Sequence, residues 1–168
     1  MGNSSKNSFN IKKVLLISVS AVALIAAAYI IKTPGTSGAK PDIRTAVKDA
    51  DIVIQTKDIT TTPSFYAAEI NGTDLEVIAV KASDGTIRTA FNTCQVCYNS
   101  GKGYYNVVGN QLVCQNCGNR FSMDAVEVTQ GGCNPVPITT DYKTVTEDTI
   151  TISKDFLTEA TVIFSNWK

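Results

Sequence analysis

Four of the five cysteines form two Cys-x-x-Cys pairs, Cys94/Cys97 and Cys114/Cys117, with sixteen residues between the pairs. A spacing of two residues lets one tight turn direct two sulfurs at the same ion. Gly118 follows the second pair and suits such a turn, because glycine tolerates left-handed backbone angles. The spacing is typical of zinc ribbons, so the pattern predicts one metal site in which all four sulfurs are ligands.

The donor set leaves the metal open. Four thiolates bind zinc, a single rubredoxin-like iron or an iron–sulfur cluster. The chain contains no histidine, which excludes a Cys2His2 zinc site, a Ser-His-Asp triad and haem ligation by histidine. Three alternatives to a redox metal stay open: zinc that only stabilises a small fold, structural disulfides, and thiol–disulfide exchange.

The fifth cysteine, Cys133, lies in the segment GGCNPVP at residues 131–137. Its two glycines allow close approach of the backbone, and its two prolines stiffen the chain that follows. One interpretation is a small buried side chain in a tight loop. The other is a fifth ligand, which replaces one of the four paired sulfurs or binds a second ion beside the first.

Four aromatic residues lie near the cysteines in sequence: Tyr98, Tyr104, Tyr105 and Phe121. They either shield a metal from water or belong to an ordinary core. Three basic residues also lie nearby: Arg88, Lys102 and Arg120. These either offset the negative charge of the thiolates or are solvated surface side chains.

The rest of the chain predicts short antiparallel strands. Asn71-Gly72 is a strong hairpin signal and joins predicted strands at residues 65–70 and 75–80. A second turn at residues 83–86 leads to a third strand at 87–91, which completes a meander. The turn Gly109-Asn110 joins strands at 104–108 and 111–113, and this hairpin should return the second cysteine pair to the first. Further strands are predicted at 51–59, 125–128 and 149–152, and short helices at 44–50 and 156–164.

Residues 14–31 form an uncharged apolar run of eighteen residues, at the short end of what a membrane-spanning helix needs. More lysines precede this run than closely follow it, so the positive-inside rule places residues 1–13 in the cytoplasm and the bulk of the chain outside. The alternative is a cleaved signal peptide, for which residues 26–28 offer a cleavage site. Fifteen basic and fifteen acidic residues balance, which gives no support for nucleic-acid binding.

We therefore predict a mainly β protein of four parts. Residues 1–13 are cytoplasmic, residues 14–31 form one transmembrane anchor, and residues 32–50 form a linker. Residues 51–168 form a small extracytoplasmic antiparallel β domain with a zinc-ribbon-like or rubredoxin-like metal site.

The segments around the cysteines resemble a known family. DGTIRTAFNTCQVCY at 84–98, GKGYY at 101–105, LVCQNCGNRF at 112–121 and GGCNPVP at 131–137 are similar to the membrane iron–sulfur-containing FtrD-like domain family. The resemblance covers about residues 51–138 and, more loosely, the chain to residue 167. It implies that five cysteines handle electrons: Cys94, Cys97, Cys114, Cys117 and Cys133.

The resemblance also implies a setting. It indicates a bacterial or archaeal membrane protein beside a ferrous-iron or other metal uptake system, with a permease and extracytoplasmic copper- or iron-binding proteins as partners. Many members of the family carry several membrane helices, whereas this chain has one predicted, so we do not expect it to be the permease.

The predicted function is thus a membrane-anchored electron-transfer accessory that uses an iron–sulfur cluster or iron. No set of residues for transforming a substrate is visible, so we expect no catalysis by the chain alone. The first alternative is a structural-zinc binding module or metal chaperone that partners a transporter, and the second is a thiol–disulfide exchange protein.

Overall fold

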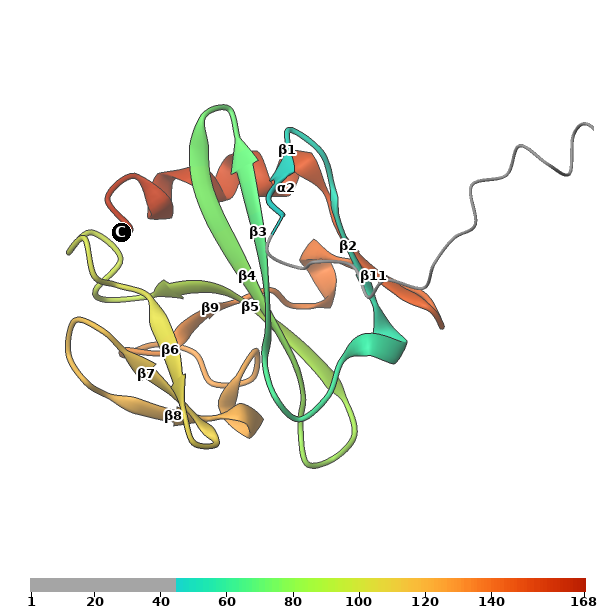
Figure 1. Ribbon diagram of the computed structural model, residues 1–168, viewed down its shortest axis with the longest axis horizontal. Coiled ribbons are helices and arrows are strands. Elements are labelled where there is room, and N and C mark those ends of the chain that lie inside the picture. The colour runs from blue at the N-terminus through green and yellow to red at the C-terminus, as the bar shows by residue number, and fades with distance from the viewer. Residues whose placement is uncertain (1–44) are drawn as a thin grey trace, which may run out of the picture. The chain divides into compact units, whose positions relative to one another are not determined.

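The structure of the protein is a computed structural model that describes residues 45–168. The predicted cytoplasmic residues 1–13, the anchor 14–31 and most of the linker 32–50 lie outside the described residues. From residue 45 onward, no helix is long and apolar enough to span a bilayer. The described chain is mainly β, as predicted, and folds into three sheets (Figure 1).

The largest sheet has five strands in the order β1-β3-β4-β5-β9. Its centre is the predicted antiparallel meander of β3 (Ser64–Ile70), β4 (Thr73–Lys81) and β5 (Ile87–Cys94). Asn71 and Gly72 turn between β3 and β4 with φ of 50° and 78°, which confirms the predicted hairpin.

Two short strands complete this sheet at its opposite edges. β1 (Val47–Lys48) pairs in parallel with β3, and β9 (Pro135–Pro137) pairs antiparallel with β5. Proline lacks an N–H group to donate to a neighbouring strand, and an edge strand needs partners on one side only. The prolines of β9 therefore fit its position.

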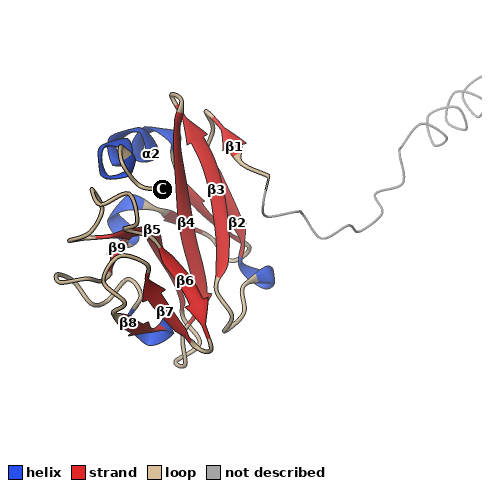
Figure 2. Cartoon of the chain, turned by 60° about the vertical axis from the view of Figure 1, so that its left-hand side comes forward, coloured by secondary structure: helices blue, strands red, loops and turns tan. Residues whose placement is uncertain are grey.

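Two three-stranded antiparallel sheets flank the large one. One has the order β10-β11-β2, from β10 (Thr144–Val145), β11 (Thr149–Ile152) and β2 (Ile52–Gln55). The other has the order β6-β7-β8, from β6 (Tyr105–Val108), β7 (Gln111–Cys114) and β8 (Arg120–Ser122). Figures 1 and 2 both show β6–β8 grouped together and apart from the helix α2.

The helix α2 (Lys154–Ala160) continues into a 3₁₀ turn, Thr161–Phe164, in the region predicted to be helical. Ser153 caps the helix, because its hydroxyl oxygen accepts a hydrogen bond from the N–H of Phe156 at 3.3 Å. Shorter 3₁₀ turns cover Thr56–Asp58, Met123–Ala125 and Thr140–Tyr142.

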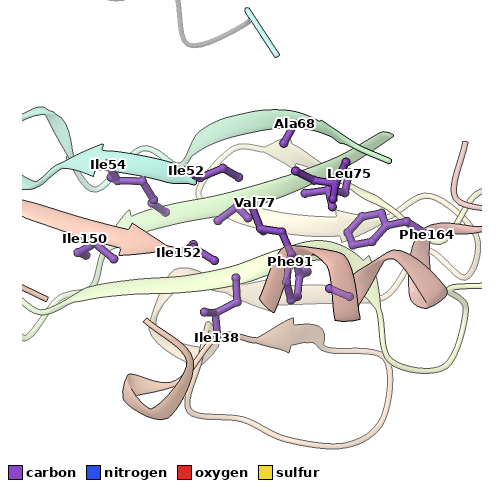
Figure 3. Close-up of a cluster of buried hydrophobic side chains, with 14 of the residues drawn as sticks. Ile52, Ile54, Ala68, Leu75, Val77, Phe91, Ile138, Ile150, Ile152 and Phe164 are labelled. Atoms are coloured by element: carbon purple, nitrogen blue, oxygen red, sulfur yellow. The ribbon is translucent and has the colours of Figure 1, made fainter. Parts of the chain in front are cut away.

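The large sheet separates two hydrophobic clusters, because successive side chains of a strand point to opposite faces. Leu75, Val77 and Ala79 of β4 enter a first cluster with β2, β11 and α2 (Figure 3). Ile78 and Val80 of the same strand enter a second cluster, together with three of the cysteines. One buried strand thus supports both the main core and the cysteine site.

Two predicted elements are wrong. Residues 47–48, within the predicted helix 44–50, form β1 because the N–H of Asp49 donates to the carbonyl of Glu69 at 2.9 Å and ties the segment to the edge of β3. The strand predicted at 125–128 is absent, since Glu127 has a positive φ of 68°. Its carboxylate turns inward and accepts hydrogen bonds from the N–H of Thr89 at 2.8 Å and from Lys143 at 2.6 Å.

Candidate metal centre

The first Cys-x-x-Cys turn extends from the end of β5, and both of its cysteines are buried. The pairing of β5 with β9 shifts register between Phe91 and Cys94, an irregularity of the kind that redirects side chains beside functional sites. The N–H of Cys94 donates to the carbonyl of Gly103 at 2.7 Å, and the N–H of Cys97 donates to the sulfur of Cys94 at 3.3 Å. The first turn therefore already has the N–H-to-sulfur bond that stabilises a thiolate.

Gly103 closes this first turn, and only glycine fits there. A Cβ atom at residue 103 would overlap the carbonyl group of Cys97 and would lie 2.9 Å from the Cα of Tyr98. Both obstacles are backbone atoms, so no side-chain rotation relieves them. The backbone at Gly103 therefore lies closer to the backbone of Cys97 and Tyr98 than any residue with a side chain would allow.

The second turn, between β7 and β8, reaches the surface. Cys114 is buried, whereas Cys117 is exposed. Gly118 adopts the predicted left-handed conformation with φ of 73°, and its N–H donates to the carbonyl of Cys114 at 2.9 Å. A Cβ atom at residue 118 would meet nothing within 4 Å, so backbone conformation alone selects glycine here.

The hairpin β6–β7 brings the two turns together, as predicted. It pairs Tyr105 with Cys114, and the N–H of Gln115 donates to the carbonyl of Tyr104 at 2.9 Å. As a result, the sulfurs of Cys94, Cys97 and Cys114 all lie within 4.8 Å of one another. We call these three residues the inner triad; that its sulfurs bind a metal remains a prediction.

Cys133 joins the cluster from the loop before β9. Its sulfur and those of Cys97 and Cys117 form a second set within 4.8 Å, which we call the outer triad. Cys133 is only partly buried and lies against Cys117, so the structure places it beside the other cysteines, and both interpretations of the residue, a small side chain in a tight loop and a fifth ligand, remain predictions. The hydroxyl of Tyr105 donates to its carbonyl at 2.5 Å.

The surroundings of the thiols lower the pKa of some and raise the pKa of others. Burial opposes a charge on Cys94, but the nearby Tyr105 hydroxyl and the backbone N–H groups of Cys97 and Val96 outweigh it, so the pKa of Cys94 lies below its usual value. Burial raises the pKa of Cys97 and raises the pKa of Cys114 to about 12. The N–H of Asn119 lowers the pKa of Cys117.

Only some of the aromatic and basic residues predicted to lie near the site contact the cysteines. Tyr105 and Phe121 pack in the cluster that holds the cysteines, whereas Tyr104 packs in the main core and Tyr98 is exposed. Burial raises the pKa of Tyr105, so its hydroxyl keeps the proton that it donates. Arg88 pairs with Asp84 at 2.6 Å and therefore has an acidic partner of its own.

The sequence analysis missed Gln95, which lies inside the first Cys-x-x-Cys pair. Its N–H donates to the carbonyl of Asn134 at 3.0 Å, and its side chain donates to the carbonyl of Pro135 at 3.2 Å and accepts from the N–H of Gly131 at 3.0 Å. These three bonds fasten the loop of Cys133 to the first turn. No sequence signal marks them, because the partners are about forty residues apart.

One known family matches the chain. It is described as the FtrD-like family of membrane iron–sulfur containing proteins, and the match covers residues 60–164, more than half of the chain. The chain belongs to this family. The resemblance drawn from the cysteine segments is thereby confirmed, and all five cysteines of this FtrD-like protein lie within the matched residues. No curated protein and no solved structure matches the chain.

Proposed function

We propose that this FtrD-like protein holds iron in its cysteine cluster, as an iron–sulfur cluster or a single iron, and transfers single electrons for a ferrous-iron uptake system. The observation that carries the proposal is the convergence of both Cys-x-x-Cys pairs in a member of a family described as membrane iron–sulfur containing proteins. Thiolates are the ligands that such centres use.

The residues present fit a single iron ion. Three thiolates around one ion at about 2.3 Å are roughly 4 Å apart, a spacing that the 4.8 Å limit of the inner triad accommodates. Bound iron would supply one-electron chemistry. The chain supplies the N–H bond to Cys94, a hydrophobic wall that includes Tyr105 and Leu112, and an exposed edge at Cys117. These features hold the thiolates, exclude water from one side and leave the other side open to a partner.

The proposed setting is the outer face of a membrane. The family consists of membrane proteins, and the charge asymmetry around residues 14–31 favours an N-terminus inside the cell. We propose a metal permease and extracytoplasmic metal-binding proteins as partners. Purification of the full chain together with the products of its gene neighbours tests this part, and a chain that purifies without a permease contradicts it.

The metal is tested on the full chain, purified anaerobically in detergent. We expect iron, visible absorbance and an electron paramagnetic resonance signal in one redox state, all lost in Cys94→Ser. Val96→Ser is the matched control, because Val96 lies between Cys94 and Cys97 and is 62% exposed. Stoichiometric zinc without visible absorbance contradicts the proposal, as does a metal-free protein that forms a reversible disulfide within one Cys-x-x-Cys pair.

A further inference from the structure

We infer that the five thiols form a two-ion site in which the sulfur of Cys97 bridges the ions, with Cys117 and Cys133 completing an exposed outer position for a thiophilic cation. This inference deepens the proposed metal-binding function of the cluster. It does not depend on iron or on electron transfer, because it concerns how many soft cations the thiols hold and where.

The first argument is geometric. The inner and outer triads each have all three sulfurs within 4.8 Å, and Cys97 is the residue that they share. A tetrahedral ion takes four ligands, so one ion cannot bind all five sulfurs. A thiolate has lone pairs for two ions, which makes a shared sulfur the natural bridge between adjacent positions.

The second argument is electrostatic. Five thiolates around one divalent ion carry three uncompensated negative charges. A second divalent ion leaves one uncompensated negative charge. An ion at the outer position therefore reduces the electrostatic repulsion among the sulfurs that the fold holds close together.

The third argument is that the outer position is held in place. The loop of Cys133 is fixed by the Tyr105 hydroxyl on the Cys133 carbonyl and by Gln95 on both Gly131 and Asn134. Gln95 itself lies between Cys94 and Cys97, so the outer sulfurs are fastened to the turn that carries the bridge. Cys133 thus belongs to an assembled group of sulfurs and is not a lone surface thiol.

The two positions differ in access. All three inner residues are buried, whereas the outer triad contains the exposed Cys117 and the partly buried Cys133. With three protein ligands, the outer ion keeps a coordination position for water or for a donor from another protein. We therefore expect the outer ion to exchange faster, and the ligands favour soft cations such as Cu(I) and Zn(II) over Mg(II) or Ca(II).

The test uses the full chain, purified anaerobically, stripped of metal and loaded with ¹¹³Cd(II), a thiophilic probe. We expect two bound ions per chain and two ¹¹³Cd resonances with resolved scalar coupling, since a shared thiolate links the ions through two bonds. One bound ion, or two resonances without coupling, overturns the inference. This measurement uses the unaltered chain, so its result is valid even if a variant fails to fold.

Two variants test which cysteines bind the outer ion and which one bridges the two ions. Cys133→Ser should keep one resonance and one ion, whereas Cys97→Ser should abolish the coupling. Val128→Ser, at an exposed residue of the same loop, is the matched control and should keep both ions. Two coupled ions in Cys133→Ser overturn the assignment. A zinc-loaded natural protein would contradict the electron-transfer proposal and leave this inference intact, so the two fail separately.

Discussion

The two Cys-x-x-Cys turns have the same spacing but different surroundings. The first, Cys94–Cys97, is enclosed by the large sheet and closed by Gly103, where a side chain would overlap backbone. The second, Cys114–Cys117, ends at the surface, and Gly118 has open space around it. The same motif therefore provides a fixed half and an accessible half, and the difference arises from packing rather than from the motif.

The largest expected difference between the halves is in thiol reactivity once metal is removed. At pH 8 we expect iodoacetamide to modify Cys117 about a thousandfold faster than Cys114, because only the thiolate reacts. The N–H of Asn119 lowers the pKa of Cys117 below its usual 9.0, whereas burial raises the pKa of Cys114 to about 12.

The same experiment has a pH signature. As the pH rises, the rate at Cys117 should level off first, while the rate at Cys114 should continue to rise toward pH 12, because each rate follows its thiolate fraction. Mass spectrometry of peptides at timed intervals measures both rates. Equal rates at the two residues at pH 8 would show that the halves do not differ in this way.

The second effect is on metal affinity. Cys94→Ser should weaken binding at the inner triad by about a hundredfold or more, since structural zinc sites with four ligands are worth about 10–16 kcal/mol in total. Cys117→Ser should weaken inner binding by less than about tenfold, because Cys117 lies outside the inner triad. Competition with a chelator of known affinity measures both. The comparison fails if the order of the two variants is reversed.

The third effect is on folding. Gly103→Ala should lower the free energy of unfolding of the metal-free chain by about 3 kcal/mol or more, because backbone must move to admit the methyl group. Gly118→Ala, the matched control, should cost only about 1–2 kcal/mol, the penalty for a left-handed conformation. Urea denaturation followed by circular dichroism compares them, and equal losses would remove the steric distinction between the turns.

The smallest effect is on the reduction potential of a redox-active centre. Tyr105→Phe should make the potential more negative by some tens of millivolts, since the Tyr105 hydroxyl favours the charged form of the Cys94 sulfur. Tyr98→Phe is the control, because Tyr98 is exposed at the rim of the same turn. Potentiometric titration measures both variants. A potential that moves equally in both would locate the effect outside the Tyr105 contact.

Local signals predicted most of the strands. Asn71-Gly72 and Gly109-Asn110 mark two hairpins because glycine and asparagine tolerate a positive φ, and the turns at residues 71–72 and 83–86 located β3, β4 and β5. The errors arose where distant residues intervene. Glu127 leaves the extended conformation while its carboxylate binds Lys143, whose side chain is 3% exposed, and β1 forms because the edge of β3 is available to pair with it.

By itself, the sequence determined which residues are the candidate metal ligands and that both cysteine pairs should meet, because the spacing of each pair and the hairpin between them are local properties of the chain. Only the tertiary structure decided that Cys133 joins them, that Cys97 is common to two sets of sulfurs, and that both cysteines of the first turn are buried while Cys117 of the second is exposed. Those features depend on contacts between residues far apart in sequence, such as Gln95 with the loop before β9, and no local pattern encodes such contacts.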